Sequence, residues 1–374
     1  MSSEPTSLVE HFASLEDPRV LKKNQHKLLD IVVIAICGII CGADDWVAIA
    51  EFGRSKESWF RTFLELPNGI PSHDTFGRVF SLLSPTEFQS CFTRWMRSLT
   101  GVFEGLVAVD GKTLRRSHDR RSNRAAIHMV SAWAIENSLV LGQVKTDEKS
   151  NEITAIPELL RALALEGCLV SIDAMGCQRA IAKPIVEQGG DYLLALKGNQ
   201  GNLSEEVEAL FDEADQVSYE GYGVQFHETQ EHNHGRHEVR RYWTMACEGR
   251  LTYAKRWSKL NMVGMVESER TVDGETSIEY RYYIGSFGND VQTFARGARG
   301  HWGVENGLHW VLDVAFREDD SRVRKGHAPE NLALLRHIAV NLLNQEKTAK
   351  LGVKNKRLKA GWDESYLAKL LLRL

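Results

Sequence analysis

Two apolar runs of the sequence each end in an aspartate. The run LVAVD reaches Asp110, and the run LVSID reaches Asp173. Each has the length and aliphatic composition of a buried strand, so each predicts a carboxylate at a strand end. If the two strands are neighbours, the carboxylates stand side by side, and their repulsion favours a divalent cation between them. A pair of such ions can activate a water or hydroxyl and stabilise the leaving oxygen when a phosphodiester is cleaved.

Two aspartates rarely complete such a metal site, and a third acid is expected in the segment RGHWGVENGLHWVLDVAF, residues 299–316. Its apolar residues recur with helical spacing. Glu305 lies one turn from both His301 and His309, so one helix would present all three on one face. The competing interpretation is a solvated glutamate on an amphipathic helix. The other acids nearby are Asp313, Glu318, Asp319 and Asp320.

The donors in this set are carboxylate oxygens. No Cys and His set with zinc-ligand spacing accompanies them. Hard oxygen ligands favour Mg²⁺ or Mn²⁺ over zinc. The sequence therefore predicts two Mg²⁺ (or Mn²⁺) ions bound by the three acids.

The elements expected around the aspartates form a mixed α/β fold. Strands are predicted at 106–110, 128–136 and 139–146, and a helix at 155–163. The strand that ends at Asp173 follows, and after it another helix and another strand. Such an order builds a mixed sheet with helices packed against it.

Residues 1 to about 100 differ, because apolar stretches with helical spacing alternate there with turn signals. This pattern predicts an all-helical N-terminal domain. Ser72 or Asp74 would cap one of its helices, which carries Phe76, Val79 and Phe80 on one side.

Composition limits the possible classes of protein. The chain has 374 residues, 43% of them hydrophobic, which is enough for a large core divided into two or three lobes. Its 46 basic and 50 acidic residues give a formal charge of -4, so any signal of nucleic-acid binding must be local. The longest uncharged apolar run, IVVIAICGIICGA, is too short to span a bilayer. Without a signal-peptide pattern, a cytoplasmic protein with no membrane partner is expected.

Local basic clusters do occur. The first follows Asp110 directly and could neutralise phosphates beside a metal site, although a solvated turn is the alternative. It comprises Lys112, Arg115, Arg116, Arg120, Arg121 and Arg124, set against a single Asp119. A second cluster follows the Glu305 segment and comprises Arg322, Arg324 and Lys325. A third, near the C-terminus, includes Lys356 and Arg357.

Six segments carry a resemblance to a known family. They are VAVDGKTLRRS, KSNEITAIPELL, VSIDAMGCQRAIA, DYLLALKGNQ, HWGVENGLHWVLDVAFREDDSRVRKGHAPENLALLRHIAVNLL and KNKRLKAGWDESYLAKLL. Over nearly its whole length the chain resembles the DDE-type insertion-sequence transposases, in the group of H-repeat-associated proteins. The resemblance implies an RNase H-like catalytic core and an acid triad that binds Mg²⁺. It places that triad at Asp110, Asp173 and Glu305, the acids chosen above.

The resemblance also implies a domain organisation and partners. A helical domain at 1–100 would recognise DNA ends or mediate dimerisation, and a catalytic domain at 101–345 would carry a β-rich insertion at about 201–290. A basic segment at 346–374 would follow. The implied activity is cleavage at insertion-sequence ends and strand transfer into target DNA, by a homodimer on DNA and without a small-molecule substrate.

Further DNA contacts come from the resemblance. The motif HGRHEVR is similar to one in related transposases and contributes Arg236 and Arg240. LKGNQ places Lys197 and Asn199 near the site.

The sequence departs from the superfamily at one place. The Tyr, Arg, Glu, Lys pattern found there corresponds to Ala298, His301, Glu305 and Leu312. His301 could still donate to a phosphate, whereas Leu312 cannot, so Arg299 or Lys325 is expected to substitute.

Two other functions are compatible with the same residues. One is an RNase H-like, metal-dependent nuclease that cuts without strand transfer. The other is an inactive, DNA-binding relic of a transposase, because an intact triad does not establish activity. The sequence alone does not separate these from an active transposase.

Overall fold

The chain divides into two compact units, which a computed structural model describes at residues 8–20, 24–100, 103–118, 125–146, 152–233 and 235–372. The terminal unit comprises Met1–Val102, Gly111–Lys149 and Glu305–Leu374, and the central unit comprises Phe103–Asp110 and Ser150–Val304. Three predicted DNA contacts lie outside the described residues, namely Arg120, Arg121 and Arg124.

The described residues before 103 form helices and no strand. These helices are α1 (Leu8–Phe12), α2 (Leu28–Ile40), α3 (Trp46–Ser55), α4 (Glu57–Phe60), α5 (His73–Leu82) and α6 (Pro85–Thr100). Every residue of α2 except Leu29 is buried, as expected for a helix that is apolar on all sides. Among the described helices, none is both long enough and apolar enough to cross a membrane.

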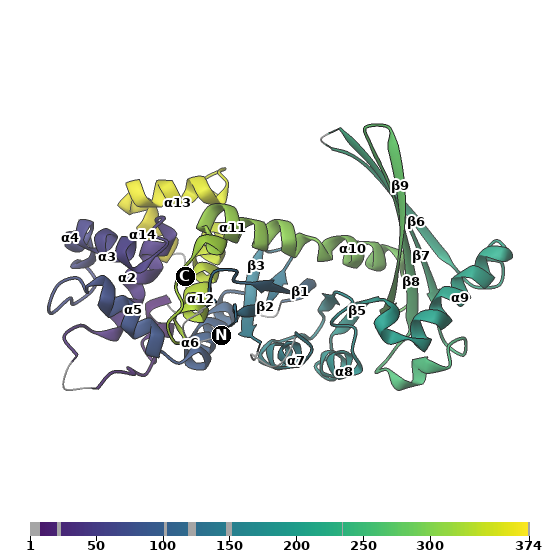
Figure 1. The fold of residues 1–374 in the computed structure, drawn as a ribbon, viewed down its shortest axis with the longest axis horizontal. Coiled ribbons are helices and arrows are strands. Elements are labelled where there is room, and N and C mark those ends of the chain that lie inside the picture. The colour runs from purple at the N-terminus through teal and green to yellow at the C-terminus, as the bar shows by residue number, and fades with distance from the viewer. Residues whose placement is uncertain are drawn as a thin grey trace, which may run out of the picture. The chain divides into compact units, whose positions relative to one another are not determined.

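The C-terminal helices complete the core of the same unit. They are α11 (Trp310–Phe316), α12 (Ala328–Gln345), α13 (Val353–Trp362) and α14 (Glu364–Leu372). Figure 1 shows α12 beside α2, α5 and α6, and it packs against all three. The two ends of the chain therefore share one hydrophobic core.

Ser72 caps α5, which decides between the two expected candidates. Its hydroxyl accepts a hydrogen bond from the Thr75 N–H at 3.3 Å. Phe76, Val79 and Phe80 are fully buried, so the predicted apolar face of this helix is confirmed.

A β-hairpin belongs to the terminal unit as well. Its antiparallel strands are β2 (His128–Ala134) and β3 (Leu139–Lys145). The buried Asn341 of α12 accepts a hydrogen bond from the Val140 N–H and donates one to the Val140 carbonyl, both at 2.8 Å. This amide satisfies the backbone of β3 where the helix covers it.

The strands form a mixed sheet with the order β3-β2-β1-β4-β5-β9-β8-β7-β6. Strand β1 (Leu106–Thr113) begins in the central unit, where it runs parallel to β4 (Leu169–Ile172), and β4 runs parallel to β5 (Asp191–Leu196). The mixed α/β fold predicted from the sequence is confirmed, and it fits the RNase H-like core that the resemblance implies.

The region between β5 and the Glu305 segment is rich in strands. After α9 (Asn202–Gln216), four strands pair antiparallel in sequence order. They are β6 (Gln225–Asn233), β7 (Arg236–Ala246), β8 (Met262–Val272) and β9 (Glu275–Gly285). Strand β9 pairs antiparallel with β5, so these strands extend the central sheet.

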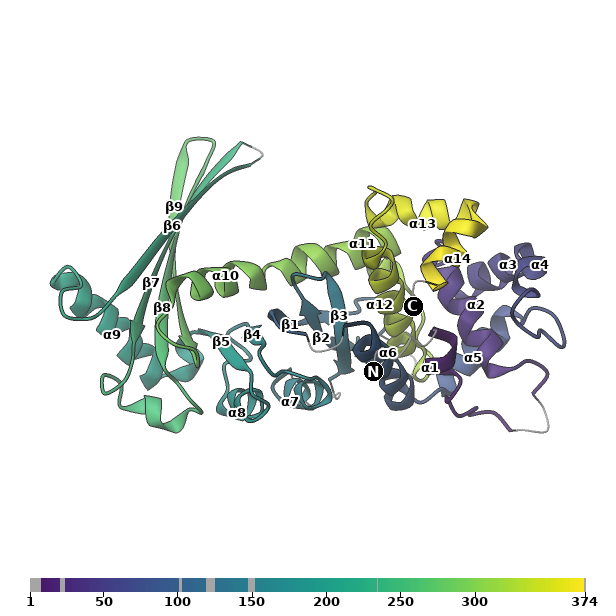
Figure 2. The ribbon, with the colours of Figure 1, turned by 180° about the vertical axis from the view of Figure 1, so that it is seen from behind.

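Helices cover both faces of the parallel strands in the central unit. In Figures 1 and 2, α7 (Glu152–Ala162) and α8 (Arg179–Glu187) lie on one face, and α10 (Val291–His301) lies on the other. Helix α10 packs directly against β4 and β5. Strands β1 and β4, and with them Asp110 and Asp173, therefore belong to a three-layer core.

A buried carboxylate organises the middle of the terminal unit. The Glu318 side chain is 2% exposed, and its oxygens pair with Arg336 at 3.3 Å and with Lys112 at 3.1 Å. Lys112 also contacts Asp313 at 2.7 Å and Asp319 at 3.3 Å. Burial raises the pKa of Glu318, but the charges of Arg336 and Lys112 outweigh it and hold that pKa below its ordinary value. The carboxylate is therefore ionised, and its charge is shared by two cations.

His337 adjoins this group as a neutral side chain. Burial lowers the pKa of His337 to about 4, and the charges of Arg336 and Lys112 act in the same direction against the opposing effect of Glu318. The histidine consequently adds no positive charge to the buried group near neutral pH.

Replacing Glu318 with alanine should lower the free energy of unfolding by about 3–5 kcal/mol, because Arg336 and Lys112 would lose a counter-ion they share in the interior. Equilibrium unfolding in urea measures the change. Glu51→Ala is the control, since Glu51 pairs with Arg54 on an exposed helix face. That variant should leave the urea midpoint almost unchanged. Equal shifts for both variants would contradict the role assigned to Glu318.

Acidification should destabilise the fold between about pH 6.5 and pH 4. The unfolded chain protonates its histidines near pH 6.5, whereas folded His337 has a pKa of about 4. Below pH 6.5 the unfolded state binds the extra proton, so stability falls, by roughly 3 kcal/mol over the full window. Urea unfolding at several pH values should show this slope, and His337→Gln should flatten it. The same slope in the variant would exclude His337 as its source.

Candidate active site

Asp110 and Asp173 lie at the same end of the β1–β4 pairing. Asp110 is within β1, which continues to Thr113 and so extends past the predicted strand end, and Asp173 directly follows β4. The last register pair of β1 and β4 joins Val109 to Ile172, so each aspartate is the next residue of its chain segment. Neighbouring strands lie about 4.8 Å apart, a spacing at which two carboxylates can share a divalent ion. Both aspartates are partly exposed. The prediction that their strands are neighbours is confirmed.

The loop after β4 holds Asp173 in a defined orientation. The Asp173 Oδ1 accepts hydrogen bonds from the N–H groups of Met175 at 3.1 Å and Gly176 at 3.2 Å. Asn199, which follows β5, donates from Nδ2 to the Ala174 carbonyl at 2.7 Å. Asn199 therefore positions the loop that carries Asp173, a role that differs from the DNA contact predicted for it.

Helix α10 approaches the two strands closely because two of its residues are glycines. A Cβ added at Gly300 would lie 2.2 Å from Cδ2 of Leu106 in β1, and one at Gly297 would lie 2.7 Å from Cδ2 of Leu193 in β5. At the end of the helix, His301 Nδ1 lies 3.2 Å from the hydroxyl of Ser171, two residues before Asp173. The chain thus passes beside β4 four residues before Glu305.

Glu305 begins a short π-helical segment, Glu305–His309, in the terminal unit. The helix predicted over 299–316 is confirmed for most of its residues, with a turn at Trp302 and a π-helical stretch at Glu305–His309 in place of regular α-helix. A Cβ at Gly307 would lie 3.2 Å from the ring of Trp133, so this turn packs closely on β2. Single π-helical turns are frequent at functional sites.

Glu305 differs from the other acids of the segment that follows it, because those acids have ion-pair partners. Asp313, Glu318 and Asp319 all pair with Lys112. Asp320 pairs with Arg317 at 3.2 Å. Glu305 is exposed and has no ion pair or side-chain hydrogen bond among the residues that the structure describes. Of this group, it is the acid left available for a ligand.

The donor chemistry of the two aspartates fits a hard divalent ion such as Mg²⁺. Asp173 uses Oδ1 for backbone hydrogen bonds, and its Oδ2 has no partner within the described ranges. Across those ranges, no three His, Cys, Asp or Glu side chains are grouped as a metal site. The central unit by itself therefore supplies a pair of carboxylates.

The basic residues after Asp110 have partners within the chain. Lys112 is only 13% exposed at its side chain and belongs to the buried Glu318 group. Arg115 contacts Asp319 at 3.1 Å and Arg116 contacts Asp320 at 3.6 Å, but their side chains stay 78% and 47% exposed. Lys112 therefore has a structural role, whereas the two arginines are accessible to a phosphate.

Three more predicted DNA contacts are paired with glutamates in the central unit. Arg240 contacts Glu231 at 3.3 Å and Glu238 at 2.5 Å, and Arg236 lies 3.8 Å from Glu238. Arg299 of α10 contacts Glu231 at 3.1 Å. These pairs connect β6 and β7 to α10, and Arg240 in particular is only 11% exposed.

Lys356 and Arg357 are buried, although the sequence analysis predicted them to bind DNA. Lys356 Nζ donates to the Leu343 carbonyl at 2.9 Å. Arg357 donates from Nε to the Ile39 carbonyl at 3.1 Å and also pairs with Asp44. Both cations join α13 to the core, and because they are buried their side chains are not accessible to DNA.

The remaining predicted contacts are accessible. Arg322, Lys325 and Lys197 are exposed, and Arg324 is half-buried with its Nε donating to the Arg116 carbonyl at 3.0 Å. Ser171 was not predicted from the sequence, and its contact with His301 joins residues 130 positions apart in the chain. No local pattern around Ser171 could have indicated it.

Comparisons with known proteins agree in pointing to one family. A family model described as "Transposase DDE domain" matches residues 102–342, and one described as "DDE_Tnp_1-associated" matches residues 9–96. The "H repeat-associated putative transposase YhhI" of Escherichia coli (strain K12) is 42% identical over 98% of each chain. The "Putative transposase YncI" of Escherichia coli O157:H7 is 41% identical over 98% of this chain and 94% of its own.

A solved structure is also similar, at a lower level. The cryo-EM structure of the piggyBac transposase synaptic complex with hairpin DNA gives a TM-score of 0.45 at 11% identity, covering 97% of this chain and 76% of that one. A likeness of that size carries no argument about the site.

Gly300→Ala should destabilise the central unit. The added Cβ would overlap the buried Leu106, and overpacking costs about 1–3 kcal/mol, more than the roughly 1 kcal/mol by which alanine exceeds glycine in helix propensity. Urea unfolding measures the loss. Gly288→Ala is the control, because a Cβ there meets no atom within 4 Å. In a Leu106→Ala background the Gly300 substitution should cost less, and an unchanged cost would show that Leu106 is not the obstacle.

Proposed function

Since the chain belongs to the DDE transposases, in the H repeat-associated group, we propose that Asp110, Asp173 and Glu305 are the acid triad of a Mg²⁺-dependent DNA strand-transfer reaction. The observation that carries the proposal is the register of β1 and β4, in which Asp110 and Asp173 are the residues directly after the last register pair, Val109 with Ile172. The absence of a partner for Glu305 among the described residues supports its assignment as the third acid.

The reaction we propose has two steps. A water attacks the phosphorus at the end of the insertion sequence, and the bond from phosphorus to the 3′ oxygen breaks, leaving a 3′-OH and a 5′-phosphate. That 3′-OH then attacks a phosphodiester of the target, and the new DNA bond forms as the old one breaks. When bound, two Mg²⁺ (or Mn²⁺) ions would supply Lewis-acid stabilisation of the attacking and leaving oxygens.

The residues of the chain would hold the acids in place for both steps. The N–H groups of Met175 and Gly176 fix Oδ1 of Asp173, which leaves Oδ2 available to a ligand. Asn199 holds the same loop from β5. The contact of His301 with Ser171 fixes the end of α10, from which the chain continues to Glu305. These are positioning roles, and they account for the use of residues from several elements.

DNA is the proposed partner, both as insertion-sequence terminal repeats and as target DNA. Two ends must be brought together for transposition, so a homodimer on DNA is part of the proposal. Arg115, Arg116, Lys197 and Arg322 are the exposed cations among the predicted contacts that we retain, together with Lys325.

A strand-transfer assay tests the function. Purified protein would be incubated with Mg²⁺, labelled DNA carrying the ends that flank its own gene, and a supercoiled target. Wild type should form joined products, and Asp173→Asn or Glu305→Gln should lower their rate by about 100-fold or more, because several kcal/mol of charge stabilisation are lost. Glu158→Gln, on the exposed surface of α7, is the matched control and should retain activity.

Other outcomes would favour the other functions. Cleavage without joined products would support a metal-dependent nuclease, and DNA binding without cleavage would support an inactive relic. Full activity in Glu305→Gln would remove Glu305 from the triad and leave the two aspartates in question.

A further inference from the structure

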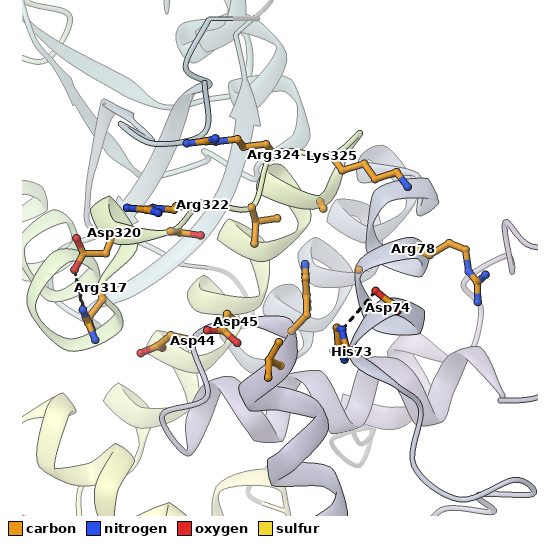
Figure 3. A pocket seen from close by; sticks show the side chains of 16 residues that line it. Asp44, Asp45, His73, Asp74, Arg78, Arg317, Asp320, Arg322, Arg324 and Lys325 are labelled. Atoms are coloured by element: carbon orange, nitrogen blue, oxygen red, sulfur yellow. Dashed lines mark hydrogen bonds and ion pairs between the residues drawn. The ribbon is translucent and has the colours of Figure 1, made fainter. Parts of the chain in front are cut away.

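We propose that a cavity in the terminal unit binds the sugar-phosphate backbone of duplex DNA, an inference that rests on the proposed function and names a binding site for its substrate. The cavity has a volume of about 880 Å³. One wall comes from the beginning of α3 and the first turns of α5, and the other from residues 317–328, between α11 and α12. Figure 3 shows the charged side chains around it.

Hydrogen bonds to backbone carbonyls of α5 and the residue after it hold the two walls together. The buried Asn331 of α12 donates from Nδ2 to the carbonyls of Phe80 at 2.9 Å and Leu83 at 3.0 Å. The His327 N–H donates to the Ser81 carbonyl at 3.1 Å. A preformed cavity loses little conformational entropy when it binds a ligand.

The acids that line the cavity all have partners in the chain. The pairs are Asp44 with Arg357, Asp45 with the Ala48 N–H, Asp74 with His73, and Asp320 with Arg317 and Arg116. Arginines therefore offset the charges of Asp44 and Asp320. Asp45 instead caps α3, and Asp74 contacts a histidine that is charged only when protonated.

Three cations of the cavity are in the opposite situation. Arg78, Arg322 and Lys325 are exposed, and their side chains have no hydrogen-bond or ion-pair partner among the described residues. Arg78 comes from α5, and the other two come from the facing wall, where Figure 3 shows them with Arg324. Unpaired cations therefore line both walls of the cavity, within the part of the chain that the structure describes.

Apolar side chains line the same cavity. Trp46 is fixed by stacking on Phe80, with ring centroids 5.0 Å apart and planes 8° from parallel. Val47, the next residue, is 54% exposed. Most protein contacts to DNA go to its phosphates and sugars, and a surface with both unpaired cations and apolar side chains suits them.

A polyanion fits the arrangement better than a small anion does. The three cations are solvent-exposed, and they come from two facing walls, Arg78 from one and Arg322 and Lys325 from the other. They do not line one enclosed anion site. A mononucleotide or inorganic phosphate would meet one or two of them, whereas a DNA backbone can meet all three.

The cavity also joins the two matched family regions. Its α3 and α5 residues lie within 9–96, and its other wall lies within 102–342. DNA bound there would contact the N-terminal helices and the segment that follows Glu305 at the same time. Neither region alone forms the cavity.

Fluorescence anisotropy with duplex DNA carrying the flanking ends tests the proposal across a range of salt concentrations. Each lost phosphate contact should lower the slope of log affinity against log salt by about 0.9. Arg78→Gln should show one such decrease, and the triple variant with Arg322→Gln and Lys325→Gln a decrease of roughly 2 to 3, with affinity at least about tenfold weaker at 0.1 M salt. Thermal melting would verify that the variants fold.

Arg161→Gln is the matched control, because Arg161 of α7 in the central unit is exposed and has no ion-pair partner among the residues that the structure describes. It should leave the affinity and the slope unchanged. If wild type binds DNA and the triple variant binds as Arg161→Gln does, the cavity is not the DNA site, while the proposed function stands. If wild type itself does not bind DNA, the proposed function fails. Equal weakening in Arg161→Gln and Arg78→Gln would indicate non-specific attraction and overturn the assignment.

Discussion

The buried carboxylate of Glu318 is the constraint on which the terminal unit depends. An ionised carboxylate in the interior costs several kcal/mol unless it is paired, and here Arg336 and Lys112 both pair with it. Lys112 lies two residues after Asp110, and it also binds Asp313, eight residues after Glu305. The ion group therefore ties together the two chain segments that follow candidate acids, which explains why a lysine stands so close to Asp110.

In the central unit, close packing of a helix backbone on the strands holds the segments that lead to the candidate acids. Gly297 and Gly300 let α10 lie directly on the parallel strands, because any side chain at these positions would overlap a buried leucine. The contact of His301 with Ser171 then fixes the end of that helix beside β4. The site uses helices and strand ends as rigid supports, and only the short loop after Asp173 needs a further hydrogen bond, from Asn199.

Positive charge has two separate uses in this chain. Arg357 is buried and neutralises Asp44, so that α13 can pack on the core. Arg78, Arg322 and Lys325 instead stay in solvent around a cavity, with no ion-pair partner among the described residues. A chain with a formal charge of -4 can thus present a positive surface to DNA, because its acids are used internally and some of its cations are not.

The sequence by itself determined the features that depend on near neighbours in the chain. The apolar runs before Asp110 and Asp173 predicted buried strands that carry acids, and the spacing of Phe76, Val79 and Phe80 predicted the buried face of α5. The tertiary structure decided which charges are free, since the partners of Lys112 are about 200 residues away in the chain. It also decided that the helical segment is π-helical at Glu305–His309, which the periodicity of the sequence did not indicate. Local periodicity carries no information about such pairings, because burial and counter-ions are set by elements that meet only in the folded protein.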